Sequence, residues 1–250
     1  NRAVKNTKRG AVVYVLANGP SLNNYPKEKL FGKDVIVMNA FHLCTWKDKV
    51  NIVAHCFGEP SWSPAWEDPF SSFMRTNAGS YWMHLSSKGR IDPSRYAGKR
   101  FFYVCPAVPT RFWGSGKPDL ALPVLGYMTT AQLAIMVAIY MGYSKIYLLG
   151  FDHDWLAQRK ISPHFYEEND SVKPADLSAF SYYSLIKMVK EKWEIYYKLQ
   201  NVAKRAGINI INLSRPTYLD VFAYGDNHDV EEIDQQGDAQ TEPLAEQTDI

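Results

Sequence analysis

The chain has 250 residues, of which 46% are hydrophobic and 22% charged, which suffices for one large α/β domain, alone or with a small lid. The net charge of +2 is spread along the sequence, so the basic footprint of a nucleic-acid-binding protein is absent. Three cysteines, Cys44, Cys56 and Cys105, show neither metal-ligand spacing nor a disulfide framework, and we expect free thiols. Aromatic residues make up 14% of the chain; they either fill the core or line carbohydrate and nucleobase sites.

The sequence predicts no transmembrane segment, because no apolar run approaches the roughly 18 residues that a bilayer span needs. Residues 1–9 carry four positive charges and lack the apolar stretch of a signal peptide. We expect a solvated segment there, with peripheral contact to an anionic membrane as the alternative. The expected location is the cytoplasm, with the inner face of the membrane as the second choice.

The first half of the chain predicts four strands with irregular structure between them. Short apolar runs that end at turn residues occupy 10–17, 34–38, 51–54 and 100–104. Residues 58–93 are rich in Trp, Pro and Ser without a clear period, and we expect loops and short helices beside the sheet.

The second half begins with a helix at 129–141, which Thr129 or Thr130 caps and Gly142 ends. This helix is apolar nearly all round and should be buried against the sheet. A central strand at 145–149, a polar lid at about 153–175, a broken or bent helical region at 176–206 and a last strand at 208–213 follow. Residues 225–250 are acidic and rich in Gln, so we expect a disordered tail or an arm on another subunit of a homo-oligomer.

Strands that alternate with helices predict one Rossmann-like parallel sheet, flanked by helices, with a lid over the carboxyl ends of the strands. We assign residues 1–224 to this domain. Such sheets bind ligands beyond the carboxyl ends of their strands, and the candidate site residues all follow a strand or begin a helix there. They are Asn18, Gly19, Pro20, Ser21, Asn39, Thr129, Thr130, Gly150, Phe151, Asp152, His153 and Asp154.

The turn Asn18-Gly19-Pro20-Ser21 ends the first strand, and Ser21 is suited to cap a short helix after it. A glycine at this place lets the backbone approach a phosphate or ribose, and free amides attract an anion. The turn is neither a dinucleotide fingerprint nor a P-loop, and a plain tight turn is the alternative interpretation.

Thr129 and Thr130 stand at the start of a buried helix, where two hydroxyls and open amides make a seat for a phosphate. Plain helix capping is the alternative. Asp152 and Asp154 follow the central strand; they suit ribose hydroxyls or a divalent ion against a diphosphate. Mn²⁺ or Mg²⁺ is therefore expected only with a diphosphate donor.

Of the six histidines, only His153 and His164 fall in segments that should reach the strand-end face. His164 lies in the predicted lid, where a histidine can act as a general base or can simply be solvated. The others, which are His42, His55, His84 and His228, have no supporting context.

Taken together, these motifs resemble the bacterial lipooligosaccharide sialyltransferases. The matching text is ANGPSL at 17–22, Asn39 after VIVM, and TTAQLAIMVAIYMGYSKIYLLGFD at 129–152. The resemblance implies a CMP-sialic acid donor, a glycan or lipid-linked oligosaccharide acceptor, surface-glycan (lipopolysaccharide or capsule) biosynthesis and no required cofactor. It also implies that the strand-end candidates bind the donor and that His164 is the general base.

The family has tyrosines soon after its Gly-x-Asp element, whereas this chain has His153, Asp154 and Trp155, with Tyr166 the next tyrosine. The strand-turn motifs also resemble, more weakly, an uncharacterised domain family that contains archaeal pterin pyrophosphokinases. Three alternatives therefore stay open. They are a metal-dependent transferase of a UDP- or GDP-sugar, an ATP-dependent diphosphotransferase, and a nucleotide-binding module without activity.

Overall fold

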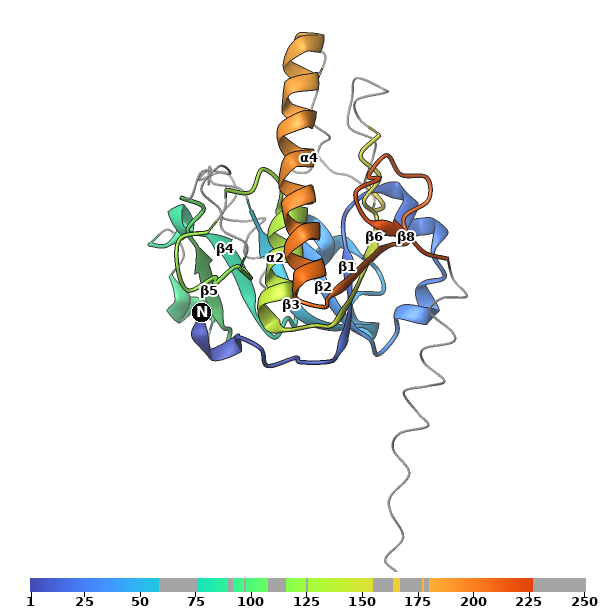
Figure 1. Ribbon diagram of the computed structural model, residues 1–250. Helices are drawn as coiled ribbons and strands as arrows, with labels where there is room; N and C mark the ends of the chain where they lie inside the picture. Colours follow the sequence, from blue (N-terminus) through green and yellow to red (C-terminus); the bar gives the residue numbers. More distant parts are fainter. Residues whose placement is uncertain are drawn as a thin grey trace, which may run out of the picture.

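A computed structural model of the chain describes residues 1–58, 76–89, 92–96, 98–107, 116–124, 126–154, 164–166, 177 and 180–226. An eight-stranded parallel sheet forms its centre, with the strand order β5-β4-β3-β2-β1-β6-β7-β8 (Figure 1). The strands are β1 (Val12–Leu16), β2 (Asp34–Met38), β3 (Asn51–Phe57), β4 (Tyr81–His84), β5 (Phe101–Val104), β6 (Lys145–Leu149), β7 (Asn209–Asn212) and β8 (Ala223–Tyr224). The predicted fold class is therefore confirmed.

One face of the sheet packs against α2 (Thr130–Met141). Every residue of α2 from Gln132 to Met141 is buried, which explains why this helix has no polar side. Thr129 is its N-cap, in a capping box with Gln132, and Gly142 ends it in the left-handed conformation at φ 95°. The predicted boundaries of this helix are confirmed.

The second long helix, α4 (Tyr182–Arg205), packs its C-terminal half beside α2 and projects beyond the sheet at its other end (Figure 1). Its charged and apolar residues alternate with a helical period, so one stripe faces the core. The break or bend predicted within 176–206 is wrong for the described part, because α4 runs through 24 residues as one helix.

Short 3-10 segments cover the opposite face of the sheet. They are η2 (Pro20–Asn24), η3 (Lys27–Leu30), η4 (Asn39–Leu43) and η5 (Lys47–Lys49). The side chains of β1 point alternately to the two faces of the sheet. Val13 and Val15 pack toward α2, whereas Tyr14 and Leu16 pack toward the 3-10 segments. Burial on both faces accounts for the continuous apolar runs of the central strands.

Two strands were not predicted. β4 lies within the segment 58–93, which was expected to form loops and short helices and also contains η7 (Leu85–Ser87); η8 (Pro93–Tyr96) begins at its end. β8 is a two-residue edge strand. Most of the predicted lid and the tail beyond Asp226 lie outside the described residues. Of the helices that are described, none is long and apolar enough to cross a bilayer.

Candidate functional site

The topology of the sheet reverses between β1 and β6. The chain builds β1 to β5 outward on one side and then returns to place β6 on the other side of β1. Ligands of open α/β sheets bind at such a switch point, beyond the carboxyl ends of the strands. The predicted turn follows β1 and the predicted Gly150–Asp154 segment follows β6, so the structure brings these two motifs together.

Asn18 and Asn39 end neighbouring strands. Leu16 of β1 is in register with Val37 of β2, and continuing this register by two residues brings Asn18 level with Asn39. Adjacent strands lie about 4.8 Å apart, so the two residues follow neighbouring strand ends. Asn39 is exposed and adopts the left-handed conformation at φ 48°, which turns the chain away from the strand.

The side chain of Asn18 has an unsatisfied acceptor. Asn18 is only 9% exposed, and its Oδ1 atom has no hydrogen-bond partner among the residues that the structure describes. A buried acceptor without a partner costs about 1–3 kcal/mol, which a hydroxyl or amino group of a ligand would recover. This observation points to a ligand at the end of β1.

The turn and the end of β6 are in direct contact. The amide of Gly19 donates to the carbonyl of Gly150 at 3.0 Å. A Cβ atom on Gly19 would lie 2.5 Å from that carbonyl oxygen and 2.6 Å from Cγ of Asp152. The space beside Gly19 is thus taken by the end of β6, and this contact alone requires a glycine; an approach of the turn to a phosphate stays a prediction.

Ser21 bonds to Asp152 and does not cap the short helix. The expected capping role is wrong, because Gly19 is the N-cap of η2 and no side chain caps it. The amide of Ser21 donates to Oδ2 of Asp152 at 2.9 Å, and its hydroxyl donates to Oδ1. Burial raises the pKa of Asp152, the bonds from Ser21 oppose this, and the nearby Asp154 adds to it. Asp152 therefore ties the turn to the end of β6.

A divalent cation at this place would have to share the Asp152 carboxylate with Ser21. Asp154 is the second carboxylate of the segment. Within the described ranges, no three His, Cys, Asp or Glu side chains gather in a way that could hold a metal ion. Asp152 and Asp154 are the two carboxylates that a metal against a diphosphate would use, and this assignment stays a prediction.

His55 was missed by the sequence analysis. It lies in the middle of β3, fully buried, where Nε2 contacts the carbonyl oxygen of Asn39 at 2.9 Å and Nδ1 contacts Oγ1 of Thr76 at 2.9 Å. Burial lowers its pKa to about 3, so the ring is neutral. A histidine within the otherwise apolar run NIVAHCF was the available signal, because a buried polar group needs partners.

Both threonines at the start of α2 are engaged by protein groups. Thr129 Oγ1 accepts from the amide of Gln132 at 3.2 Å, as in plain capping. Thr130 Oγ1 accepts from the amide of Gly58 at 3.1 Å and so ties the end of β3 to the helix. Their role in donor binding stays a prediction, because the backbone amides in the first turn of a helix can bind a phosphate.

His153 and Phe151 face the protein. His153 contacts the hydroxyl of Tyr196 on α4 through Nε2 at 3.0 Å, and burial lowers its pKa to about 3. Phe151 is buried, its amide donates to Oγ of Ser214 at 2.9 Å, and its carbonyl accepts from Thr217 at 2.6 Å. These contacts hold the segment after β6 in place.

His164 is brought to the turn by the residue that follows it. The amide of Phe165 donates to the carbonyl of Asn18 at 3.0 Å, and the side-chain amide of Asn23 donates to the carbonyl of Phe165 at 3.1 Å. The ring of His164 stacks on Tyr166, with centroids 5.0 Å apart and planes inclined by 9°. Two backbone anchors therefore place the candidate base beside the candidate donor turn.

No protein-family model and no curated protein matches this chain. Among solved structures, MAf glycosyltransferase from Magnetospirillum magneticum AMB-1 aligns with a TM-score of 0.50 and 11% identity, over 89% of this chain and 34% of that one. The sialyltransferase CST-II in complex with a trisaccharide acceptor and CMP aligns with a TM-score of 0.48 and 14% identity, over 85% of both chains. CstII from Campylobacter jejuni with CMP-3FNeuAc gives 0.47 and 14%, over 86% of this chain and 85% of that one. At these identities, the likeness concerns the fold alone.

Proposed function

We propose that the chain is a glycosyltransferase that moves a sialic-acid-like or other acidic keto-sugar from a CMP-sugar to a glycan hydroxyl. One observation carries the proposal. The carbonyl of Asn18 anchors the segment of His164, while the buried side chain of the same Asn18 offers an unsatisfied acceptor to a ligand. This hydrogen bond joins the segment of the candidate base to a candidate ligand-binding residue at the carboxyl end of β1, which supports the proposal.

The proposed reaction is a single inverting displacement. The acceptor oxygen forms a bond to the anomeric carbon while the bond from that carbon to the phosphate oxygen breaks, and the electron pair leaves on CMP. His164 takes the proton of the acceptor hydroxyl. The other predicted donor residues would hold the nucleotide, which Asn18 and Asn39 approach from neighbouring strands.

The sequence resemblance to sialyltransferases also favours a CMP-sugar donor. ANGPSL, Asn39 and the stretch 129–152 are the segments that the resemblance to sialyltransferases rests on. The first and the end of the last are joined by hydrogen bonds from Gly19 to Gly150 and from Ser21 to Asp152. A monophosphate donor also suits a site in which Asp152 is held by Ser21.

Thermal shift with CMP, CDP, UDP, GDP and ATP, each with and without Mn²⁺, tests the proposal. A ligand that binds the native state raises its melting temperature, so CMP should give a metal-independent shift. CMP release from CMP-sialic acid in the presence of a glycan should follow. A preference for UDP or GDP with Mn²⁺, for ATP with release of AMP, or nucleotide binding without turnover would each replace the proposal by the corresponding alternative.

A further inference from the structure

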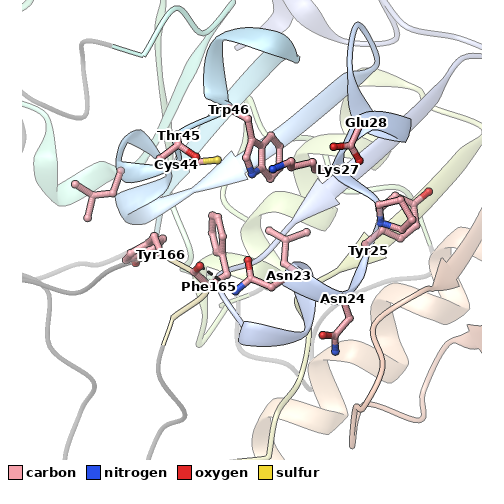
Figure 2. A pocket seen from close by; sticks show the side chains of 13 residues that line it. Asn23, Asn24, Tyr25, Lys27, Glu28, Cys44, Thr45, Trp46, Phe165 and Tyr166 are labelled. Atoms are coloured by element: carbon pink, nitrogen blue, oxygen red, sulfur yellow. Dashed lines mark hydrogen bonds between the residues drawn. The ribbon is translucent and has the colours of Figure 1, made fainter.

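A cavity of about 810 Å³ lies on the face of the sheet opposite α2 (Figure 2). Three segments line it: Leu22–Glu28, Leu43–Trp46 and Phe165–Tyr166. Its volume is within the range of small-molecule sites, which is about 300–1,000 Å³. None of the residues assigned above to donor binding lines it.

The cavity nevertheless adjoins the candidate donor site through all three walls. The first wall continues the turn at Asn18 through η2, the second follows η4, which begins at Asn39, and the third follows His164 directly in the chain. Phe165 belongs to both places, because its amide bonds to Asn18 while its side chain lines the cavity. The ring of His164 stacks on Tyr166, which lines the cavity, so a molecule bound here lies near the segment that carries the candidate base.

Aromatic rings form part of the wall. Trp46 and Phe165 pack against each other as one aromatic wall, with ring centroids 6.5 Å apart and planes inclined by 43°, and Figure 2 shows both side chains beside the space. Tyr25 and Tyr166 add further aromatic surface. Flat rings of this kind pack against the C–H face of a pyranose.

Polar groups complete the lining. Asn23 and Asn24 use their side-chain N–H groups on the carbonyls of Phe165 and Arg215, and each retains its amide oxygen as an acceptor. Lys27 and Glu28 bring opposite charges, so the lining has no excess of positive charge to attract a phosphate. Aromatic faces with neutral hydrogen-bonding groups suit a sugar ring better than a nucleotide.

The thiol of Cys44 also lines the cavity, but it is not a nucleophile. Burial raises its pKa to about 11, so it stays protonated at neutral pH. The cavity is thus a binding site without reactive groups of its own.

We propose that this cavity binds a pyranose ring of the acceptor glycan, with Trp46 and Phe165 as stacking surfaces. That the bound glycan is the acceptor rests on the proposed function, whereas sugar binding in the cavity rests on the lining residues alone. Because the third wall leads to His164, a glycan held here would present its neighbouring residue to that side chain.

The test is an NMR titration that measures binding of the methyl β-glycosides of galactose, glucose and N-acetylglucosamine to the full chain. At least one glycoside should bind with millimolar affinity. Trp46→Ala, which removes a stacking surface, and Thr45→Trp, which fills the space, should each weaken it about tenfold. Tyr197→Ala, an exposed aromatic residue on α4, is the matched control and should bind like the wild type.

Two variants are used because Trp46 also packs against Phe41, with ring centroids 5.6 Å apart, whereas Thr45 is exposed. CMP affinity should be unchanged in all of them. The proposal is overturned if no glycoside binds, if both cavity variants bind as well as the wild type, or if Trp46→Ala lowers CMP affinity and not glycoside affinity.

Failure of the proposed function has a different signature. Glycoside binding that depends on Trp46, together with no binding or turnover of any CMP compound, would keep the sugar-binding cavity and remove the CMP-dependent transferase. Transfer from a CMP-sugar with an unchanged acceptor KM in Trp46→Ala would keep the transferase and remove the cavity from its acceptor site.

Discussion

Asn18 and His55 are both buried polar side chains. Asn18 follows β1, whereas His55 lies within β3, and their burial is compensated differently. His55 has protein partners on both ring nitrogens, so its burial is compensated within the fold. The side-chain oxygen of Asn18 has no hydrogen-bond partner among the described residues. His55 thus has its polar atoms paired within the fold, whereas the amide oxygen of Asn18 keeps this residue a candidate for ligand binding.

Replacing His55 by Phe should therefore affect both stability and the neighbouring candidate site. The variant leaves the carbonyl of Asn39 and the hydroxyl of Thr76 without this partner, which should lower the free energy of unfolding by roughly 2–4 kcal/mol in urea denaturation. CMP affinity should fall about tenfold, because Asn39 keeps its left-handed conformation through that carbonyl.

His84→Phe is the matched control for this experiment. His84 lies at the rim of the sheet and caps the short helix η7, so its loss should cost about 1 kcal/mol at most and leave CMP affinity unchanged. Equal effects of the two variants on CMP affinity would speak against a positioning role for His55.

Replacing His164 by Ala tests the candidate base. Turnover should fall by a factor on the order of 10² to 10⁴ while CMP affinity stays the same, because the change removes proton transfer and leaves the turn intact. Added imidazole should restore part of the rate. A variant with near-normal turnover would remove His164 from the mechanism.

At the scale of elements, the candidate donor turn and the end of β6 form one unit through Gly19, Gly150 and Asp152. Gly19→Ala should separate them, because its Cβ atom would meet backbone and carboxylate atoms at 2.5–2.7 Å. We expect a loss of about 2 kcal/mol or more in the free energy of unfolding and a loss of CMP affinity of at least about tenfold.

Gly116→Ala provides the comparison for Gly19→Ala. A Cβ atom there meets nothing within 4 Å, and the residue is exposed. Its stability should stay within about 0.5 kcal/mol of the wild type. A Gly19→Ala variant as stable as Gly116→Ala would show that the turn and β6 are not packed as described.

The elements that could be predicted from the sequence are those with strong local signals. The boundaries of the central strands and of the capped helix α2 are visible in the sequence, since burial on both faces leaves few polar residues within them. β4 could not be found in this way: Tyr81, Trp82 and Met83 are fully buried, but the run is short and lies in a stretch rich in Ser and Pro. The order of the strands is set by contacts between distant segments and left no local pattern.

In the candidate site, too, only the features with a local signal could be predicted from the sequence. The turn at Asn18 and the segment after β6 were predicted because strand ends are visible in the sequence. The bond from Ser21 to Asp152 joins residues 131 positions apart, and a capping role for Ser21 was the local expectation. Asn39 was predicted and its support by His55 was not, because that contact comes from the neighbouring strand.

At the scale of the whole molecule, three histidines link stability to pH. Burial lowers the pKa of His55 and His153 to about 3 and that of His42 to about 4, against an ordinary value near 6.5. Below pH 6.5, the unfolded chain therefore binds up to three more protons than the folded chain. The stabilisation is fully present above pH 6.5 and is lost as the pH falls toward the folded values.

Urea denaturation at pH 7, 6 and 5 should show this loss directly. The free energy of unfolding should decrease with a limiting slope of about 4 kcal/mol per pH unit if all three histidines contribute. His55→Phe should reduce this slope by about one third, because one of the three groups no longer titrates in the unfolded chain. Asp152, whose pKa is raised by burial, acts in the opposite direction and should make the curve flatter toward acid pH. A stability that is constant between pH 7 and 5 would contradict the burial of these histidines as neutral rings.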